Sequence, residues 1–218
     1  MKKVNFNKIS KINRKYEKNF IKNFRVINKK GRYLLGDYVK NFEKKFSNYC
    51  QSKYCVAVGN CVDAIKLSFM AFKILGDLKN GDEVLVPANT YIASILGITL
   101  TNLKPVFVEP DSRTFNISTQ NILKAINKKT KAILVVDLYG HPADLFEIKK
   151  IAKKKNLKLI EDAAQSCGAK INNKMIGSIC DTTCFSFFPG KNLGAFGDAG
   201  AITTNNKKLY NILKSLRN

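Results

Sequence analysis

The chain has 218 residues, 45% of them apolar, which is enough to bury the core of one large domain or two small ones. It has no run of about 20 apolar residues and no apolar signal-peptide stretch near its start, so we expect no membrane-spanning helix and a cytoplasmic location. The net charge of +22 would suit nucleic-acid binding, but the lysines are scattered, arginine is rare and the Lys, Asn and Ile content is typical of an AT-rich genome, so we expect no specific nucleic-acid partner.

The first part of the chain shows no clear periodicity in its apolar residues. Residues 1–30 are basic, with scattered Phe and Ile and no strong period, and Gly31–Gly36 is typical of a loop. An amphipathic helix is predicted over 37–49, because its aromatic residues recur on one face. We therefore divide the chain into an N-terminal arm and loop, residues 1–36, and a large domain, residues 37–218.

From residue 54 onward, short apolar strands alternate with amphipathic helices. The predicted strands cover 54–58, 83–86, 105–108, 132–137, 158–160, 183–187 and 200–204. The predicted helices cover 62–75, 90–101, 119–127 and 143–155, and a further helix begins at 206. This alternation predicts an α/β fold with a mostly parallel seven-stranded sheet flanked by helices, in which the strand at 200–204 is antiparallel. Ligands of such sheets bind at the carboxyl ends of the strands.

The cysteines do not form a recognisable metal or disulfide framework. There are six of them, with no CxxC pair, and His141 is the single histidine of the chain. A zinc site needs closer ligand spacing and usually more histidine. We therefore expect no metal site and reduced, mostly buried thiols.

Gly59–Ala64 is the first segment whose pattern indicates chemistry. It follows a predicted strand and opens a predicted helix. The free backbone N–H groups and the dipole at such a helix start bind anions. A plain strand-to-helix turn has the same pattern, so the residues alone leave both readings open.

Two adjacent acids, Glu161 and Asp162, end a buried strand. A carboxylate at this edge of the sheet can pair with a protonated ring nitrogen, and the pairing keeps the acid ionised. The alternative is that Asp162 caps the N-terminus of a following helix.

Lys191 lies in the segment with the most distinctive pattern, Phe185–Gly200. A strand ends and the lysine follows in a loop rich in Pro and Gly, before the next strand. Glycines at this density indicate close backbone approach or left-handed backbone. A lysine amine held in a partly apolar loop can act as a Schiff-base nucleophile. A solvated loop lysine is the alternative, and the apolar flanking residues argue against it.

Together these segments resemble the DegT/DnrJ/EryC1/StrS family of PLP (pyridoxal phosphate)-dependent sugar aminotransferases. The matching blocks are GRYLLG at 31–36, GNCVDAIKL at 59–67, GDEVLVPANTYIAS at 81–94, DLYGHPADL at 137–145, EDAAQSCGA at 161–169 and FSFFPGKNLGAFGDAGAI at 185–202. The resemblance covers residue 31 to the end of the chain. It implies an aspartate-aminotransferase-like large domain.

The resemblance also implies a role for each matching site residue. Lys191 holds PLP as a Schiff base and then moves a proton between Cα of the amino donor and C4′ of the cofactor. Asp162 pairs with the pyridine nitrogen and makes the ring an electron sink. The remaining contacts are to the ring and the phosphate: Gln165 lies near the 3′-hydroxyl, Tyr91 stacks on the ring, Cys61, Val62 and Asp63 offer backbone N–H groups to the phosphate, and Ser186 offers its hydroxyl to the same phosphate.

The reaction implied by the resemblance transfers an amino group, usually from glutamate, to a keto-sugar carried on a nucleoside diphosphate. The motifs are most similar to those of members that aminate C3 of a dTDP-3-keto-6-deoxyhexose, for amino-sugar or cell-surface polysaccharide biosynthesis. Related enzymes that act at C4 or on UDP-sugars share most of these motifs. The family builds its active site across a homodimer interface, so a homodimer is expected.

The chain departs from the family pattern at two places. Many members have His where this chain has Asp137, a position expected near the cofactor edge, where it would alter substrate contacts. Members also continue past the equivalent of Asn218 into a small C-terminal domain, so we expect a truncated chain whose large domain is incomplete. Two rival functions remain: a sugar 3-dehydratase, whose members carry His in place of Lys191, and a non-catalytic regulator.

Overall fold

The computed structural model describes residues 8–217. The chain divides into two compact units, one ending at Phe42 and the other beginning at Glu43. This division falls inside helix α3 (Asp37–Tyr49), later than the boundary placed after residue 36. Helix α3 itself has the bounds predicted from its aromatic face.

The first unit contains two helices, α1 (Ile9–Arg14) and α2 (Glu17–Lys30), in the arm where we found no strong period. These helices were not predicted. Phe20, Phe24 and Ile27 recur at helical spacing in α2, but the lysines and asparagines between them obscured the period. Gly31 ends the helix at φ 62°, a left-handed conformation that glycine adopts without strain.

The second unit is built on a seven-stranded sheet in the order β1-β9-β8-β5-β4-β2-β3. The strands are β1 (Tyr54–Val58), β2 (Glu83–Pro87), β3 (Lys104–Val108), β4 (Thr130–Val136), β5 (Lys158–Asp162), β8 (Thr182–Ser186) and β9 (Gly200–Thr204). Strand β9 is antiparallel to both of its neighbours, and the other recorded pairings are parallel. The predicted α/β fold with one antiparallel strand is therefore confirmed.

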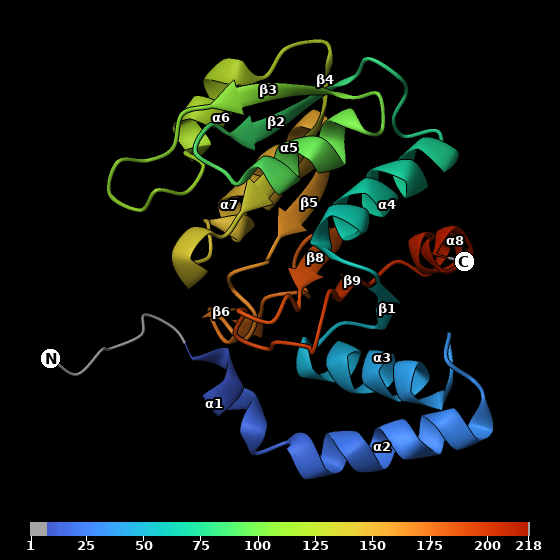
Figure 1. Ribbon diagram of the computed structural model, residues 1–218. Coiled ribbons are helices and arrows are strands. Elements are labelled where there is room, and N and C mark those ends of the chain that lie inside the picture. The colour runs from blue at the N-terminus through green and yellow to red at the C-terminus, as the bar shows by residue number, and fades with distance from the viewer. Residues whose placement is uncertain (1–7, 218) are drawn as a thin grey trace, which may run out of the picture. The chain divides into compact units, whose positions relative to one another are not determined.

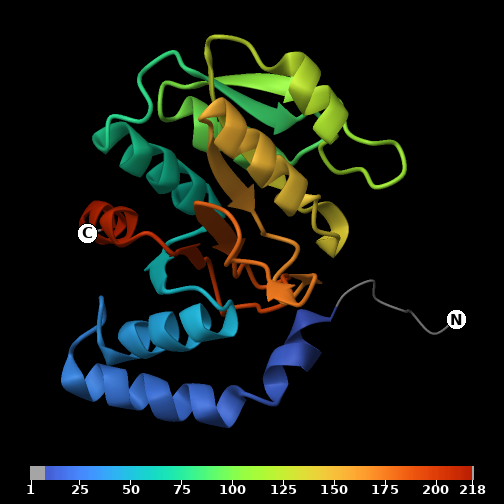
Figure 2. The same ribbon diagram turned by 180° about the vertical axis from the view of Figure 1, so that it is seen from behind.

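Helices cover both faces of this sheet. Figure 1 shows α4 (Cys61–Ile74) and α5 (Ile92–Thr99) in front of the strands, and Figure 2, from behind, shows α6 (Thr119–Ala125) and α7 (Leu145–Lys155) on the other face. Helix α8 (Lys207–Leu216) packs against α4 through Leu209 and Leu213. Because helices cover both faces, the central strands β4, β5 and β8 are buried almost throughout, as in parallel sheets generally.

The core is tightly packed between α4 and α5. A Cβ on Gly97 of α5 would lie 2.4 Å from Cγ2 of Ile65 in α4, so the two helices approach at a glycine. All six cysteines are free thiols, and five of them are buried. Between residues 8 and 217, no helix has the length and apolar character needed to cross a membrane.

Two short elements were not predicted. Strands β6 (Lys170–Ile171) and β7 (Lys174–Met175) form a hairpin whose turn residues, Asn172 and Asn173, have φ of 47° and 62°. Asparagine favours such a left-handed turn, but strands of two residues are too short to show an alternating pattern. The 3₁₀ turn η1 (Leu138–Gly140), which contains Tyr139 at φ 57°, follows β4.

Candidate active site

All eight site residues predicted from the sequence line one cavity of about 580 Å³. It opens at the carboxyl ends of β1, β2, β4, β5 and β8, as expected for a sheet of this type. The lining residues are Asn60, Cys61, Val62, Asp63, Thr90, Tyr91, Ala93, Val136, Leu138, Asp162, Ala164, Gln165, Ser186, Phe188, Lys191 and Asp198. We call it the sheet-edge cavity.

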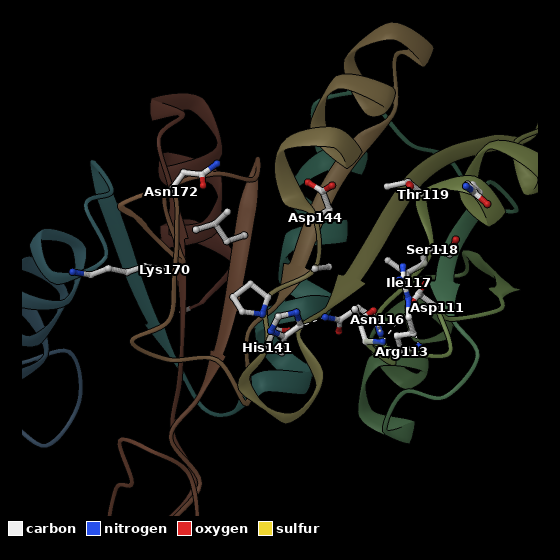
Figure 3. A pocket seen from close by; sticks show the side chains of 15 residues that line it. Asp111, Arg113, Asn116, Ile117, Ser118, Thr119, His141, Asp144, Lys170 and Asn172 are labelled. Carbon is white, nitrogen blue, oxygen red and sulfur yellow. Dashed lines mark hydrogen bonds and ion pairs between the residues drawn. The ribbon is translucent and has the colours of Figure 1, made fainter.

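A larger cavity of about 790 Å³ lies elsewhere in the second unit and contains none of these eight residues (Figure 3). Its most buried polar side chain, Asn116, points at the backbone beside His141 and is fully engaged there. The Asn116 amide donates to the His141 carbonyl at 2.8 Å and accepts from the Leu138 N–H at 3.2 Å. Because this side chain has a structural role, the larger cavity is the weaker candidate for chemistry.

The loop between β8 and β9 positions Lys191. The Lys191 N–H donates to the Phe188 carbonyl at 2.8 Å, which forms a tight turn, and a Cβ on Gly194 would lie 2.5 Å from the Pro189 carbonyl oxygen. The dense glycines therefore allow the loop to fold back on itself. Lys191 is half-buried, and its amine has no hydrogen-bond or ion-pair partner in the described part of the chain.

Asp162 ends β5 with its side chain buried in the wall of the cavity. Its Oδ2 accepts from the Ser94 hydroxyl at 2.7 Å, and its Oδ1 accepts from the Ala164 N–H at 3.1 Å and from the Cys61 thiol at 3.7 Å. Burial raises the pKa of Asp162, while these donors and the nearby Lys191 amine lower it. Residues 163–168 form no helix, so the alternative that Asp162 caps a helix is wrong.

The N-terminus of α4 differs in one respect from the expected anion site. The Asp63 N–H already donates to the Asn60 side chain at 2.8 Å, so it is not free for a ligand, contrary to the expectation. The N–H groups of Cys61 and Val62 have no acceptor within residues 8–217. A Cβ on Gly200 would lie 2.6 Å from the Asn60 carbonyl carbon, so glycine is needed for β9 to pass this turn.

Ser186 ends β8 within the same cavity. Its hydroxyl oxygen accepts from the Phe188 N–H at 3.4 Å, which leaves the hydroxyl proton available to a ligand. Together with the free N–H groups of Cys61 and Val62, it gives the cavity three donors suited to an anion.

Gln165 follows β5 and Tyr91 follows β2, and both residues line the cavity. The Gln165 Oε1 accepts from the Tyr139 N–H at 2.7 Å, so its amide nitrogen is the end left for a ligand. Tyr91 precedes α5 in an extended conformation and is 72% exposed, which leaves its ring face accessible.

Asp137 does not reach the cavity, contrary to the expectation that it alters substrate contacts. It is fully buried, and its carboxylate accepts from the Ala143 N–H at 3.0 Å and from the Ser166 hydroxyl at 2.8 Å. These donors turn the side chain away from the cavity. The position was close to the site in sequence, but the direction of the side chain was not visible there.

Four polar residues were missed from the sequence: Asn60, Thr90 and Asp198, which line the cavity, and Ser94, which donates to Asp162. Thr90 and Ser94 are hydrogen-bonded to each other at 2.8 Å, one helical turn apart. Hydroxyl residues at a helix start usually cap the helix. The signal was therefore present but had an ordinary local explanation.

Comparison with known proteins identifies relatives over nearly the whole chain. Residues 14–218 match the DegT/DnrJ/EryC1/StrS aminotransferase family. The chain is 49% identical over 215 residues to the dTDP-3-amino-3,6-dideoxy-α-D-galactopyranose transaminase of Aneurinibacillus thermoaerophilus, covering 99% of this chain and 58% of the relative.

Solved structures show the same fold. The structure of DesV from S. venezuelae, in complex with a ketimine intermediate, superposes with a TM-score of 0.94 at 38% identity and covers 100% of this chain and 58% of DesV. The E. coli GDP-4-keto-6-deoxy-D-mannose-3-dehydratase, with bound hydrated PLP, superposes with a TM-score of 0.83 at 32% identity, covering 88% of this chain and 50% of the dehydratase. The chain thus spans about half the length of the relatives it matches.

Proposed function

Because the chain belongs to the DegT/DnrJ/EryC1/StrS aminotransferase family, we propose that it is the PLP-binding portion of an enzyme that transfers an amino group to a nucleotide-linked keto-sugar. The observation that carries the proposal is that Lys191 and Asp162 line the same cavity, together with the free N–H groups at the start of α4.

The donor set of this cavity fits PLP. The N–H groups of Cys61 and Val62 and the Ser186 hydroxyl suit a phosphate. Asp162 is a buried acid without a cation at ion-pair distance in the described residues, and a protonated ring nitrogen would supply one. The unpartnered Lys191 amine suits a covalent bond to the carbonyl carbon.

Each residue then has a defined action. Lys191 would hold the cofactor through its amine and, when released, would carry the proton that amino transfer moves. Asp162 would hold the proton on the ring nitrogen. When bound, PLP supplies an electron sink for the bonds at Cα.

The contacts around the ring complete this arrangement. Gln165 would offer its amide nitrogen to the 3′-hydroxyl, and Tyr91 would cover the ring face. Asp63 contributes through its side chain, which accepts from the Asn60 amide at 3.1 Å and so steadies the cap of α4, rather than through its own N–H.

The substrate we propose is a dTDP-3-keto-6-deoxyhexose, with glutamate as the amino donor, for amino-sugar or cell-surface polysaccharide biosynthesis. The transaminase from Aneurinibacillus thermoaerophilus, named for a dTDP-3-amino sugar, supports this choice. The net charge of +22 suits an anionic substrate. The alternative is a 4-keto-sugar or a UDP-keto-sugar. We also propose a homodimer and a cytoplasmic location, as the family resemblance implies.

A sugar 3-dehydratase is the main rival, because a dehydratase shares the fold. The residue at position 191 separates the two, since the dehydratases of this family carry His there. Lys191 can bind PLP covalently, which favours amino transfer.

Borohydride trapping tests the covalent bond. PLP at equimolar concentration is reduced onto the purified protein, and peptide mapping locates the label among the many lysines. We expect it on Lys191, and we expect the Lys191→Ala variant to lose it while Lys170→Ala, an exposed control at the hairpin, retains it. Label that maps to other lysines in the unsubstituted protein, and persists undiminished in Lys191→Ala, would refute the assignment.

A substrate screen tests the reaction. Glutamate is offered with a panel of dTDP- and UDP-linked 3-keto and 4-keto sugars, and the amino-sugar product is detected by mass spectrometry. Deoxygenation at C3 instead of amination would support the dehydratase. PLP binding with no turnover on any member of the panel would support a regulator.

A further inference from the structure

Two buried acids, Asp137 and Glu161, lie beside each other outside the sheet-edge cavity, because Asp137 follows β4 and Glu161 belongs to the neighbouring strand β5. Both side chains have 0% exposure. Asp137 follows β4 directly, and its N–H donates to the carbonyl of Asp162 at 3.1 Å, so the pair lies immediately behind the proposed ring-nitrogen partner. Neither residue lines the cavity, and the proposed mechanism uses neither.

The hydrogen bonds around the pair require one proton between the two acids. Glu161 Oε2 accepts from the Thr183 hydroxyl at 2.7 Å, whereas Glu161 Oε1 has no donor within residues 8–217. Both oxygens of Asp137 already accept hydrogen bonds. Two ionised carboxylates have no proton to donate, so contact between them requires that one be protonated.

The surroundings place this proton on Glu161. Burial and the neighbouring Asp137 charge raise the pKa of Glu161 well above its ordinary value. Burial raises the pKa of Asp137 as well, but Glu161 and the Ala143 and Ser166 donors lower it, so Asp137 is the better stabilised of the two anions. Among the other titratable groups, the Asp162 charge raises the pKa of Asp137, and the Cys180 thiol lowers the pKa of Glu161. Beyond the pair, Asp181 raises the pKa of Cys180 and Lys149 lowers it.

The Asp137 carboxylate connects the two loops that hold Gln165. Its Ala143 donor closes the loop at 138–143, and its Ser166 donor belongs to the turn that contains Gln165. Between these two anchors, the Tyr139 N–H holds the Gln165 side-chain oxygen at 2.7 Å. A Cβ on Gly140 would lie 3.2 Å from the Gln165 carbonyl oxygen, so the loops also touch through backbone.

We propose that Asp137, bound to the protonated carboxyl of Glu161, is a positioning residue that sets the orientation of the Gln165 amide in the sheet-edge cavity. The inference rests on the proposed function, because Gln165 is the residue placed beside the 3′-hydroxyl of PLP.

The same carboxyl-to-amide change at the two partners should have opposite effects. In Glu161→Gln, the amide nitrogen donates to Asp137 and the amide oxygen accepts from Thr183, so the variant imitates the protonated acid. In Asp137→Asn, an amide nitrogen replaces one of the two acceptor oxygens, and the charge that strengthens both bonds is lost. Even with the Ser166 hydroxyl reversed to accept from this nitrogen, the two loops are held by weaker bonds, and Gln165 is held less firmly.

Binding and absorbance of PLP measure this difference. We expect Asp137→Asn to bind PLP about 3- to 10-fold more weakly, the effect of one lost hydrogen bond. We also expect it to shift the pH midpoint of the bound-PLP absorbance change in the direction seen for Gln165→Ala, with Glu161→Gln close to the unsubstituted protein. The Asp137→Asn/Gln165→Ala double variant should match Gln165→Ala alone, since both act through one contact. Additive effects, or equal damage from Glu161→Gln, would overturn the positioning role.

Infrared spectroscopy of the protein without PLP tests the pair by itself. At neutral pH we expect a protonated-carboxyl band that Glu161→Gln removes, and an unchanged band in that variant would overturn the shared proton. The two proposals fail separately. If the unsubstituted protein forms no reducible PLP adduct on Lys191, the proposed function fails while the infrared result still decides the state of the acid pair.

Discussion

The Ser94 hydroxyl donates to Asp162 Oδ2 at 2.7 Å in a place where Ser94 is 0% exposed. Among the hydrogen bonds and charges that lower the pKa of Asp162, this bond has the largest effect. It therefore helps to keep a buried acid ionised, which pairing with a protonated ring nitrogen requires.

Ser94→Ala should raise the pKa of Asp162 and move the acid limb of the pH profile for amino transfer to higher pH. At neutral pH we expect a loss of roughly ten-fold, the size of one hydrogen bond to a charged group. The measurement is kcat against pH, together with the absorbance of bound PLP. Ser68→Ala is the matched control, because Ser68 is equally buried in a helix but donates to the Ala64 carbonyl. An equal shift in both variants would rule out a specific effect on Asp162.

Asn60→Ala should have two effects because Asn60 caps α4 at the cavity. Loss of the cap should lower the free energy of unfolding by about 0.5–2 kcal/mol, and the disturbed helix start should also weaken PLP binding. Asn206→Ala removes an equivalent cap from α8, where the side chain accepts from Lys208 and Leu209 N–H groups outside the cavity. Urea unfolding and PLP titration of both variants should show similar destabilisation, with weaker PLP binding in Asn60→Ala alone. Unchanged PLP affinity in Asn60→Ala would contradict the proposed phosphate site.

Glu43→Gln should be among the most destabilising single changes in the second unit. Glu43 forms an ion pair with Arg217 in which the side chains are only 12% and 11% exposed, and it also accepts from the Ala57 N–H. Removing its charge leaves a buried guanidinium unpaired, which typically costs about 3–5 kcal/mol. Glu147→Gln is the control, because its ion pair with Lys150 is exposed and should contribute little. Chemical denaturation checks both, and equal effects would contradict the argument from burial.

Glu161→Gln should gain stability relative to the unsubstituted protein as the pH rises. The pKa of Glu161 is raised in the folded state, so between its unfolded value of about 4.3 and the raised folded value the native state binds the extra proton. The unsubstituted protein therefore loses stability with increasing pH through this window, and the glutamine variant lacks that loss. Urea unfolding at about pH 5 and about pH 8 measures the change in the difference between the two proteins. A difference that is constant with pH would mean that Glu161 is not protonated in the fold.

The sequence was sufficient for the sheet, because strands and helices depend on local pattern. Eight residues of the cavity followed from the family resemblance. Local signals supported it: β5 ends in two adjacent acids, and the glycines around Lys191 mark a loop that folds back on itself. The directions of Asp137 and Ser94 were not accessible in this way. Their partners come from other elements, such as Ser166 for Asp137 and Asp162 for Ser94, and no spacing along the chain specifies such pairs.

Helix α2 shows a different limit. Its apolar residues remain largely exposed within the first unit, with Phe24 at 56%, so the polar residues between them weaken the period that would mark a buried face. The hairpin at Asn172 and Asn173 illustrates the opposite case, in which the turn chemistry was readable but the strands were too short to support it.

The position of β9 between β1 and β8 has a consequence for how the protein is made. During synthesis, β1 leaves the ribosome long before β9, the strand that pairs with it across the register Tyr54–Thr204. The backbone groups of β1 that pair with β9 remain without these partners until then. The loop that carries Lys191 ends at β9 and closes only when β9 has paired. A nascent chain therefore contains Lys191 before the loop that positions it has formed. Competence to bind the cofactor is therefore a late event of folding, and the unpaired β1 is the segment that a chaperone would have to protect in the interval.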